Sequence, residues 1–499
     1  MSQPKGSESQ RGISRRSFLA GSVAAAPLTG VGRIPANASP DRSDGMAEHR
    51  LKARDVAFDD SWDVIVAGGG PAGTAAAVAA ARAGARTLLL EATGALGGMG
   101  TSGLVPWFCG YHDRKKIIAR GLAERVLDAC REGTPHLRKA MQRNRLATPA
   151  IDPELLKRVY DGLVSDAGVK VLFNTQFCAV EMRGNGEVDA VVVANKAGLG
   201  AYKARVYVDC TGDGDLAAWA GAPFEKGDES GAMQPGTHCF VITNVDEYAL
   251  RNGPRVHFFD PESPIHKAIR SPKYPHIIEL HSCSIQIGPG AIGFNTGHVF
   301  DVDNTDPASV SKALMLGRTM AREYRDAFAE FLPAFGSGFL AVTGALLGIR
   351  ETRRIMGDYV LKADDYEARR SFPDEVCRNA YGIDVHFSRE RALEFAKMPI
   401  EEVRAAIARR TQPYAPGESM GVPYRCLTPK GLRNVLVAGR CISTDRAANG
   451  SIRIMACCLN TGEAAGIAAA MAAAQASDVH GVDTNGLRDT LRKHGAYLP

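Results

Sequence analysis

The stretch from Asp63 to Glu91, DVIVAGGGPAGTAAAVAAARAGARTLLLE, restricts the possible folds of this 499-residue chain more than any other part. Val64–Val66 is a short apolar run that predicts a buried parallel strand. Thr74–Ala83 predicts a helix of small residues, and Thr87–Leu90 predicts a second strand. A strand, a helix and a second strand in this order predict the α/β class, with a Rossmann-type sheet at the centre of the fold.

Gly68, Gly70 and Gly73 form a G-x-G-x-x-G pattern between the first strand and the helix. Gly68 permits the tight turn out of the strand, Gly70 lets a pyrophosphate approach the backbone, and Gly73 lets the helix pack closely on the sheet. Pro71 and Ala72 stand where the helix begins, and its N-terminal N–H groups attract phosphates. We therefore expect these five residues to bind a dinucleotide.

Glu91 and a second glycine-rich loop indicate which dinucleotide binds. Glu91 ends the second strand, 18 residues after Gly73, where its carboxylate can accept hydrogen bonds from both hydroxyls of an adenosine ribose. Gly97, Gly98 and Met99 follow shortly after. In flavoproteins of the glutathione-reductase type, a glycine pair at this place passes the pyrophosphate and the ribityl chain. We therefore expect these residues to bind FAD.

A second G-x-G-x-x-G pattern spans Gly288–Gly293. The sequence FNTGHVFDVD follows it, which favours a strand over a helix, and Pro289 suits a turn. We expect a hairpin connection here, so the sequence predicts one dinucleotide-binding fold.

Five stretches carry a family resemblance: GGGPAG…GGMGTSGL, DCTGDGDLAAWAGAP, RETRRIMGDYVL, VPYRCLTPKGLRNVLVAGRCIS and GSIRIM. In these the chain resembles the FAD-dependent oxidoreductases, distant relatives of fumarate reductase flavoproteins and of the flavin subunit of heterodisulfide reductase. The likeness covers most of 60–226 and 346–475. It implies FAD as the cofactor and a discontinuous FAD-binding domain, 61–227 and 346–476, with an inserted α+β substrate-capping domain at 228–345.

Two of these stretches supply further candidate cofactor residues. Thr211, Gly212 and Asp213 follow a predicted strand and precede a helix, and Gly439 and Arg440 follow the last predicted strand. Many flavoproteins of the superfamily end this last strand in Gly-Asp, whose carboxylate holds a ribityl hydroxyl. The Gly439-Arg440 pair here predicts that Asp213, or the backbone near Gly439, makes that contact instead.

The first 38 residues resemble a twin-arginine export signal. Arg15 and Arg16 precede a mildly apolar run, 18–31, and the A-N-A sequence at 36–38 suits cleavage by a signal peptidase. The twin-arginine translocation machinery exports folded proteins, and FAD is made in the cytoplasm, so an external flavoprotein would need this route. We expect residues 1–38 to be removed and the mature protein to be periplasmic or extracellular.

Charge and cysteine content exclude other classes. The whole chain carries +5 and residues 1–38 carry +4, which leaves about +1, without the basic stripe of a nucleic-acid binder. No later stretch has the roughly 20 apolar residues of a membrane span, so we expect no stable membrane insertion of the mature form. The 11 cysteines contain no CxxC pair, and we interpret most of them as small core residues.

The remaining segments complete the predicted organisation. Residues 39–60 are polar and predict a flexible linker. The inserted segment, 228–345, mixes strand-like runs with a helix near 308–331. The alanine-rich run 464–474 predicts the last helix of the flavin domain, and 477–499 predicts a polar C-terminal tail with one short helix.

Three residues are candidate catalytic groups beside the flavin. Arg353 lies in GIRETRRIMGDY together with Arg350 and Arg354. If this run is helical, Arg350 shares a face with Arg353 or Arg354, and that face is either solvated and paired with Glu351 and Asp358 or a clamp for a carboxylate. His386, in the strand-like YGIDVHF, either transfers a proton or only accepts and donates hydrogen bonds. Arg453 stands where the final helix begins, a helix that Asn449 or Ser451 would cap, and it either stabilises reduced flavin or forms a structural salt bridge.

The predicted function is an exported FAD-dependent oxidoreductase that transfers a hydride between a small organic substrate and flavin N5. An electron-transfer subunit and a non-catalytic flavin-binding protein are the alternatives. A flavin monooxygenase is disfavoured because the sequence predicts a single dinucleotide fold. The spacing of histidines, cysteines and acids matches no metal-ligand pattern, so no metal is expected. Composition does not distinguish among substrates, reaction directions, electron acceptors or oligomeric states.

Overall fold

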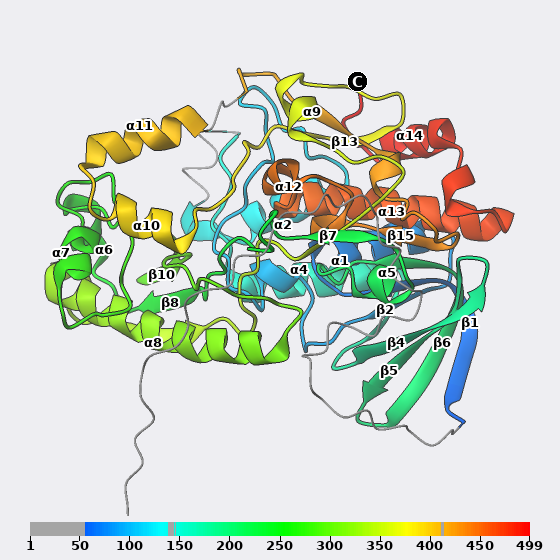
Figure 1. Cartoon of the computed structure of the whole chain (residues 1–499), viewed down its shortest axis with the longest axis horizontal. Coiled ribbons are helices and arrows are strands. Elements are labelled where there is room, and N and C mark those ends of the chain that lie inside the picture. Colours follow the sequence, from blue (N-terminus) through cyan, green and yellow to red (C-terminus); the bar gives the residue numbers. More distant parts are fainter. Residues whose placement is uncertain (1–54, 138–143, 145, 411–413) are drawn as a thin grey trace, which may run out of the picture. The chain divides into compact units, whose positions relative to one another are not determined.

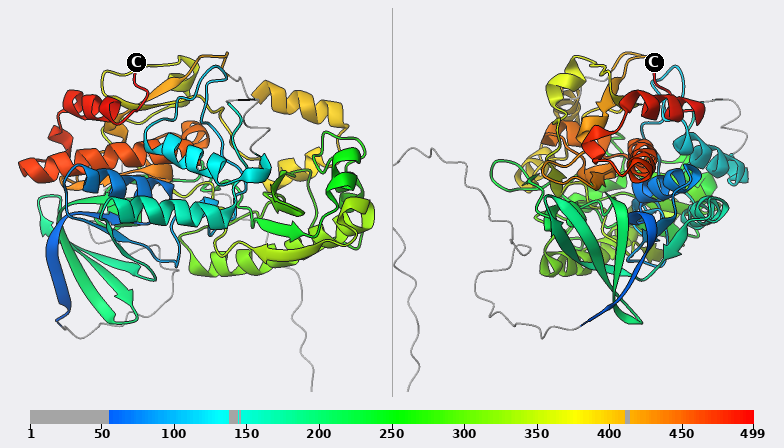
Figure 2. Two further views of the ribbon diagram at one scale, coloured as in Figure 1. Left: turned by 180° about the vertical axis from the view of Figure 1, so that it is seen from behind. Right: turned by 90° about the vertical axis from the view of Figure 1, so that its right-hand side faces the viewer.

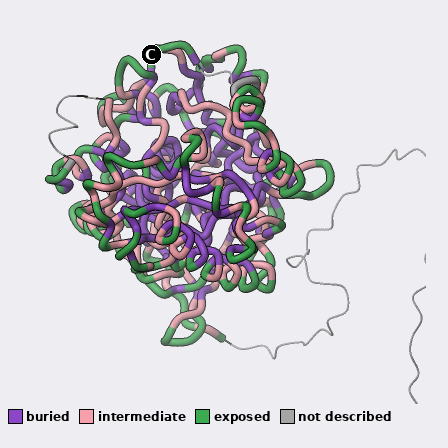
Figure 3. The backbone as a smooth tube through the Cα atoms, turned by 90° about the vertical axis from the view of Figure 1, so that its left-hand side faces the viewer, coloured by how far each residue is buried: buried purple, intermediate pink, exposed green. Residues whose placement is uncertain are grey.

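The computed structural model describes residues 55–137, 144, 146–410 and 414–499 (Figure 1). The predicted export signal and residues 39–54 of the predicted linker lie outside this described part. Within it, the buried backbone is concentrated in the interior and the exposed backbone at the periphery (Figure 3). The buried apolar side chains form two separate clusters, one around the main sheet and one within the inserted segment.

The main sheet contains the strands that the glycine-rich stretch predicts. Its strands lie in the order β3-β2-β1-β6-β5-β4, and β15 also pairs with β6. The pairs that involve β1, β2, β3 and β15 are parallel, while β4 and β5 form an antiparallel extension. This confirms the α/β, Rossmann-type prediction. The strand bounds are Ala57–Ala67 (β1), Thr87–Leu90 (β2), Lys170–Leu172 (β3), Gln176–Gly184 (β4), Glu187–Asn195 (β5), Gly198–Asp209 (β6) and Val435–Val437 (β15).

Two helices rich in small residues pack against each other over this sheet. They are α1, Pro71–Arg82, and α13, Met455–Gln475, and their ribbons run side by side (Figure 1). A Cβ atom added to Gly462 or Gly466 of α13 would lie 2.1 Å from the backbone oxygen of Ala72 or Ala76, respectively. The two backbones therefore touch directly, and small residues are needed at this contact.

The other helices around the main sheet are short or amphipathic. The buried faces of α2 and α4 add Leu and Val side chains to the same core. Figure 2 shows these helices from two further sides. The predicted C-terminal tail contains one of them, α14, whose Leu487 and Leu491 are buried. The bounds are Leu122–Glu132 (α2), Pro153–Asp166 (α4), Asp215–Trp219 (α5), Ala363–Glu367 (α9), Arg446–Ile452 (α12) and Thr484–Lys493 (α14).

The second core belongs mainly to the inserted segment. Its sheet has the order β11-β8-β10-β9, and the long helix α8 packs on it. Gly288–Gly293 joins β9 to β10 as an antiparallel hairpin, which confirms that this G-x-G-x-x-G pattern is no second dinucleotide site. The bounds are Phe240–Thr243 (β8), Ser284–Gly288 (β9), Ala291–Phe294 (β10), Phe339–Thr343 (β11), Glu247–Asn252 (α6), Pro264–Arg270 (α7) and Pro307–Phe331 (α8).

Helices α10, Arg389–Phe395, and α11, Ile400–Arg410, also belong to the second core. Phe395 and Val403 pack in its apolar cluster. The sequence analysis placed these residues in the flavin domain. The structure differs because the chain returns to the inserted segment between two strands of the flavin half, β13 (Glu375–Asn379) and β14 (Met420–Pro423).

Three local predictions are wrong. Residues 57–60 do not form part of a flexible linker, because β1 begins at Ala57 and pairs with Gly200 of β6. The run around Arg353 is not a helix: β12, Arg353–Ile355, pairs with β7, Phe224–Lys226. The segment around His386 has no regular secondary structure.

The sequence predicts that the final helix of the flavin domain begins at Arg453, but α13 begins at Met455. Arg453 instead ends the preceding helix, α12, and the chain bends by 92° between the two helices. Among the described residues, no single helix has both the length and the apolar composition of a membrane span. Helices α12 and α13 have that length and composition only when taken together, as this bent pair.

Gly466→Ala and Gly162→Ala should change stability in opposite directions. A methyl group at Gly466 meets the backbone of α1, so we expect the free energy of unfolding to fall by about 1–3 kcal/mol. Gly162 lies in α4 with no atom within 4 Å of an added Cβ, so the same substitution should raise stability by about 0.5–1 kcal/mol. Thermal unfolding followed by circular dichroism compares the two, and equal shifts would contradict the close α1–α13 contact.

Candidate functional site

A cavity of about 410 Å³ lies at the carboxyl ends of the parallel strands. This is the edge at which doubly wound sheets bind their ligands. The inserted segment closes part of it with residues such as Cys239, Asn295 and Asn304. Twelve of the predicted cofactor residues line this cavity: Gly68, Gly70, Pro71, Ala72, Glu91, Gly98, Met99, Thr211, Gly212, Asp213, Gly439 and Arg440.

The first glycine loop has the geometry that phosphate binding requires. Gly68 has φ +93°, a conformation that favours glycine. A Cβ at Gly73 would lie 1.7 Å from the backbone oxygen of Gly68, so Gly73 allows α1 to approach the strand without itself lining the cavity. A Cβ at Gly70 would meet nothing within 4 Å. The space above Gly70 is therefore open for a ligand at the N-terminus of α1.

Glu91 is fixed at the end of β2 by two backbone donors. Its Oε2 accepts a hydrogen bond from Gly69 N at 2.6 Å, and its Oε1 accepts one from Thr93 N at 2.7 Å. A carboxylate has about four lone-pair sites, so acceptor capacity remains toward the cavity for a pair of ribose hydroxyls.

The second glycine loop is tied to the first. Gly97 has φ +97° and donates its N–H to the backbone oxygen of Gly69 at 2.8 Å. Gly97 itself does not face the cavity, because a Cβ there would lie 2.7 Å from the Tyr160 ring. Gly98 and Met99 do line the cavity, within the short 3₁₀ helix Gly98–Gly100. The hydrogen bond from Gly97 to Gly69 thus fixes Gly98 and Met99 beside the first glycine loop.

Asp213 and Arg440 neutralise each other beside the cavity. Asp213 Oδ1 accepts hydrogen bonds from Arg440 Nη2 at 2.7 Å and from the Thr352 hydroxyl at 2.6 Å, and Asn304 donates to Oδ2 at 2.5 Å. Desolvation alone would raise the pKa of Asp213, but Arg440 and these donors hold it below its usual value. The carboxylate is well occupied by protein donors, which favours the backbone near Gly439 for the ribityl contact.

These residues fit FAD. The open space above Gly70 accepts a pyrophosphate, Glu91 retains acceptor sites for a ribose, and Gly98, Met99 and Gly439 form a narrow wall without bulky polar groups. The N-terminus of α13, through Met455 and Cys458, lines the same cavity. A helix N-terminus there stabilises negative charge.

Of the arginines in the run GIRETRRIMGDY, Arg350 lines the cavity, whereas Arg353, the predicted catalytic residue, does not. Arg350 is 6% exposed and donates to the Pro235 backbone oxygen, the Thr237 hydroxyl and, at 3.3 Å, Asn295 Oδ1. Among the described residues, no carboxylate forms an ion pair with it. Burial, assisted by Arg453, lowers the pKa of Arg350 to about 10, which still leaves it charged at neutral pH.

Arg453 faces the same part of the cavity. It ends α12, and its Nη2 pairs with Asp384 Oδ2 at 3.1 Å, while its buried Nε has no hydrogen-bond partner among the described residues. The predicted caps are wrong, because Asp445 caps α12 and no side chain caps α13. Arg453 thus has a salt bridge and also a position in the cavity, so both interpretations of it stand.

Arg353 lies outside the cavity. Its Nη1 pairs with Asp215 Oδ1 at 2.7 Å and donates to the Asp213 backbone oxygen. Arg353 begins strand β12, whereas Arg350 precedes it in a segment without regular secondary structure, so the two side chains do not share a helical face. Arg353 therefore stabilises the cofactor loop, and Arg350 takes the place in the cavity.

His386 lines the cavity, as predicted for a proton-transfer residue. Its Nδ1 lies 2.7 Å from Nε2 of His298, whose Nδ1 lies 2.8 Å from Glu279 Oε2. Burial, with Arg350 close by, lowers the pKa of His386 to about 4, so its imidazole is neutral at physiological pH.

The sequence analysis missed the histidine cluster around His386. His281, His298 and His386 each offer one ring nitrogen within 4.8 Å of the other two. His281 and His298 flank the β9–β10 hairpin, and His386 lies 88 residues after His298, so no local metal-ligand spacing indicates them. Only the packing of the inserted segment against 380–388 brings them together.

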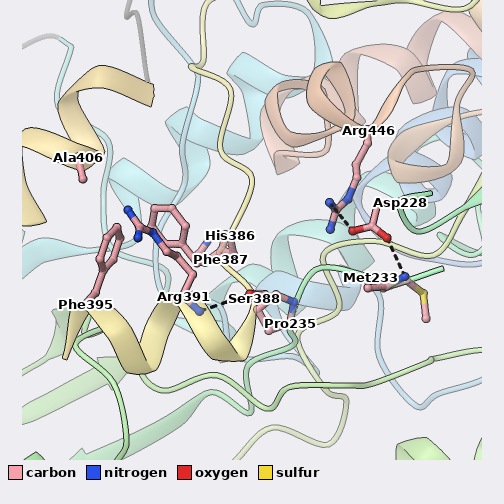
Figure 4. A pocket seen from close by; sticks show the side chains of 11 residues that line it. Asp228, Met233, Pro235, His386, Phe387, Ser388, Arg391, Phe395, Ala406 and Arg446 are labelled. Atoms are coloured by element: carbon pink, nitrogen blue, oxygen red, sulfur yellow. Dashed lines mark hydrogen bonds and ion pairs between the residues drawn. The ribbon is translucent and has the colours of Figure 1, made fainter. Parts of the chain in front are cut away.

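A second cavity, of about 390 Å³, shares His386 with the first (Figure 4). Its cations have partners: Arg446 pairs with Asp228 at 3.2 Å and with Glu351 at 3.0 Å, and Arg391 pairs with Glu394. Phe387 and Phe395 add apolar surface. Unlike the first cavity, it therefore presents no unpaired cation.

Comparison with known proteins identifies the family. The family model described as FAD dependent oxidoreductase matches residues 63–491. Among solved structures, the anhydrotetracycline hydroxylase OxyS from Streptomyces rimosus is 16% identical, with a TM-score of 0.40 over 86% of this chain and 65% of its own. The alignment therefore spans less than two thirds of that hydroxylase.

Two further solved structures have similar scores. A geranylgeranyl bacteriochlorophyll reductase-like protein from Thermoplasma acidophilum is 13% identical, with a TM-score of 0.38 over 88% of this chain and 83% of its own. The L-proline dehydrogenase from P. horikoshii is 12% identical, with a TM-score of 0.39 over 87% of this chain and 99% of its own. The family match extends over most of the chain and over both walls of the cavity, and the protein accordingly belongs to the FAD dependent oxidoreductase family.

Proposed function

We propose that the protein is an exported FAD-dependent oxidoreductase that acts on a small organic carboxylate. One observation carries the substrate class: Arg350 is a buried guanidinium in the cofactor cavity without an ion-pair partner among the described residues. When bound, FAD accepts the electron pair of the substrate as a hydride. The cavity must then bind an anion, orient it and remove a proton.

The state of Arg350 favours an anionic substrate. Arg350 has three neutral hydrogen-bond acceptors but no ion-pair partner among the described residues. Burial of a charge without a counter-charge costs free energy, and a bound anion would offset that cost. Guanidinium groups bind carboxylates through two parallel hydrogen bonds. Arg453, with its free Nε at the same cavity, supplies a second cation for the same anion.

His386 is placed to accept the proton that leaves the substrate. It is neutral at physiological pH because burial and Arg350 lower its pKa, and a neutral imidazole has a free lone pair. Arg350 and His386 line one cavity. A substrate whose carboxylate is held by Arg350 could therefore present its hydroxyl or amine to the lone pair of His386. We also propose that the inserted segment caps the substrate. In support, Cys239, Asn295 and Asn304 of this segment line the same cavity.

Export remains part of the proposal on the strength of the first 38 residues. Arg15 and Arg16, the mild apolar run and the A-N-A site occur in the order of a twin-arginine signal. A cofactor enclosed between two cores requires a folded protein, and this route exports folded proteins.

Gly70→Val should abolish FAD binding and leave the fold intact. A valine side chain would fill the space above the loop without meeting protein atoms, because nothing lies within 4 Å of the added Cβ. The purified wild type should be yellow and release FAD on denaturation, whereas the variant should be colourless with an unchanged far-ultraviolet spectrum. Gly162→Val in α4 is the control and should stay yellow. A yellow Gly70→Val protein would contradict the assigned loop.

Anaerobic screening of hydroxy- and amino-carboxylates against their methyl esters tests the substrate class. We expect acids, and not esters, to bleach the flavin absorbance. Arg350→Met should raise KM for the acid by roughly 10- to 150-fold, because a hydrogen bond to a charged group contributes about 1.5–3 kcal/mol. Reduction by esters as fast as by acids, or an unchanged KM in the variant, would remove Arg350 from substrate binding.

Replacement of Arg15 and Arg16 by lysines should retain the protein, still yellow, in the cytoplasm. The physical reason is that the paired guanidinium groups are the recognition element of the signal. Fractionation of cells with an antibody against the mature chain measures the effect. Unchanged export of the double variant would refute the proposed route.

A further inference from the structure

A hydrogen-bonded chain of titratable side chains leads away from the cofactor cavity. His386 Nδ1 and His298 Nε2 are 2.7 Å apart, and His298 Nδ1 and Glu279 Oε2 are 2.8 Å apart. The backbone N–H of His298 also donates to Glu279 Oε1 at 2.5 Å. Glu279 and His298 are 4% and 6% exposed, so bulk water does not compete for these hydrogen bonds.

Each hydrogen bond in this chain holds one proton, which permits two arrangements. With Glu279 ionised, His298 is protonated on Nδ1 and His386 on Nδ1, so His386 Nε2 is free to accept a proton. With Glu279 protonated, His298 and His386 carry their protons on Nε2. His386 then donates toward Asp384, whose Oδ2 lies 3.5 Å away.

Burial shifts the pKa values of the groups in this chain in opposite directions. Burial raises the pKa of Glu279, while His281, the His298 backbone N–H, His386 and Arg350 oppose that rise. Burial lowers the pKa of His298 well below its usual value, and His386 and Arg350 add to this. The other charged or titratable groups at the chain are Arg453, Asp384 and Tyr324.

The two ends of the His386–His298 pair face different spaces. His386 lines the cofactor cavity, and His298 lines a separate cavity of about 260 Å³ with His276, Asp301 and Lys312. A proton that enters at His386 therefore moves away from the cofactor cavity toward Glu279, which is bonded to His298.

We propose that Glu279 and His298 are positioning residues that keep His386 Nε2 free, and that the three side chains relay the substrate proton out of the cofactor cavity. This rests on the proposed function of His386. The proton leaves the substrate hydroxyl or amine for His386 Nε2, and His386 passes its Nδ1 proton to His298 Nε2. His298 then passes its Nδ1 proton to the Glu279 carboxylate, while the electron pair leaves the substrate as hydride.

A shared metal ion is the competing role for these histidines. His281 and His298 are stacked with ring centres 4.2 Å apart and planes 13° apart, so their in-plane lone pairs run parallel and do not converge on one ion. Arg350 and Arg453 also place two positive charges beside the cluster. The geometry favours the relay.

Selective ¹⁵N-histidine NMR at mildly alkaline pH tests the relay without a substrate. In the wild type we expect His298 and His386 to be protonated on Nδ1. In Glu279→Gln, the amide oxygen must accept from the His298 backbone, so the amide nitrogen donates to His298 Nδ1 and both rings should move their protons to Nε2. His276→Gln is the control, because His276 pairs with Glu323 outside the chain and should leave both tautomers unchanged.

Wild-type His298 protonated on Nε2, or identical tautomers in Glu279→Gln, would overturn the relay. So would a stoichiometric metal ion in the purified protein that is lost in His281→Ala. If an acid reduces the flavin, Glu279→Gln should lower the rate of flavin reduction by roughly 10²- to 10⁴-fold and leave KM unchanged. Arg350→Met should instead raise KM for that acid. An inactive screen would count against the proposed function only, because the NMR measurement needs no substrate.

Discussion

The position of the cofactor cavity depends on direct backbone contacts among the loop after β1, helix α1 and helix α13. Gly73 brings α1 onto the loop at Gly68, and Gly462 and Gly466 bring α13 onto α1. Two parts of the chain almost 400 residues apart thereby form one rigid wall. The N-termini of both helices open into the same cavity, so the wall presents positive dipole ends to a bound flavin.

The rest of the cavity lining carries the groups that could act on a substrate: Arg350 and His386 come from the second flavin-domain segment, and the inserted segment adds Cys239, Asn295 and Asn304. The cofactor side neutralises its charges internally, as in the Asp213–Arg440 pair. The facing side leaves Arg350 buried without an ion-pair partner among the described residues and places neutral His386 next to it. A buried cation without an ion-pair partner and a neutral imidazole with one free lone pair are complementary to an anionic substrate that loses a proton. Binding of that anion would offset the free-energy cost of burying Arg350.

Local sequence rules predict the cofactor half well and the substrate half poorly. Turn, helix and strand between Gly68 and Glu91 obey short-range constraints, so both their bounds and their roles could be predicted. Arg353 was chosen over Arg350 because the expected helix does not form: β12 begins only at Arg353, and Arg350 lies before it in a segment without regular secondary structure. The Glu279–His298–His386 chain was missed because tertiary packing alone joins its segments. The outer half of β1 was missed because its polar residues pair only with β6.

A crystal structure of the FAD-loaded protein soaked with acetate tests the central claim most directly. The account predicts carboxylate density within hydrogen-bond distance of the Arg350 guanidinium, on the substrate side of the flavin and within reach of His386. Density that shows Arg350 bound only to the flavin or to protein atoms, with acetate absent from the cavity, would contradict it.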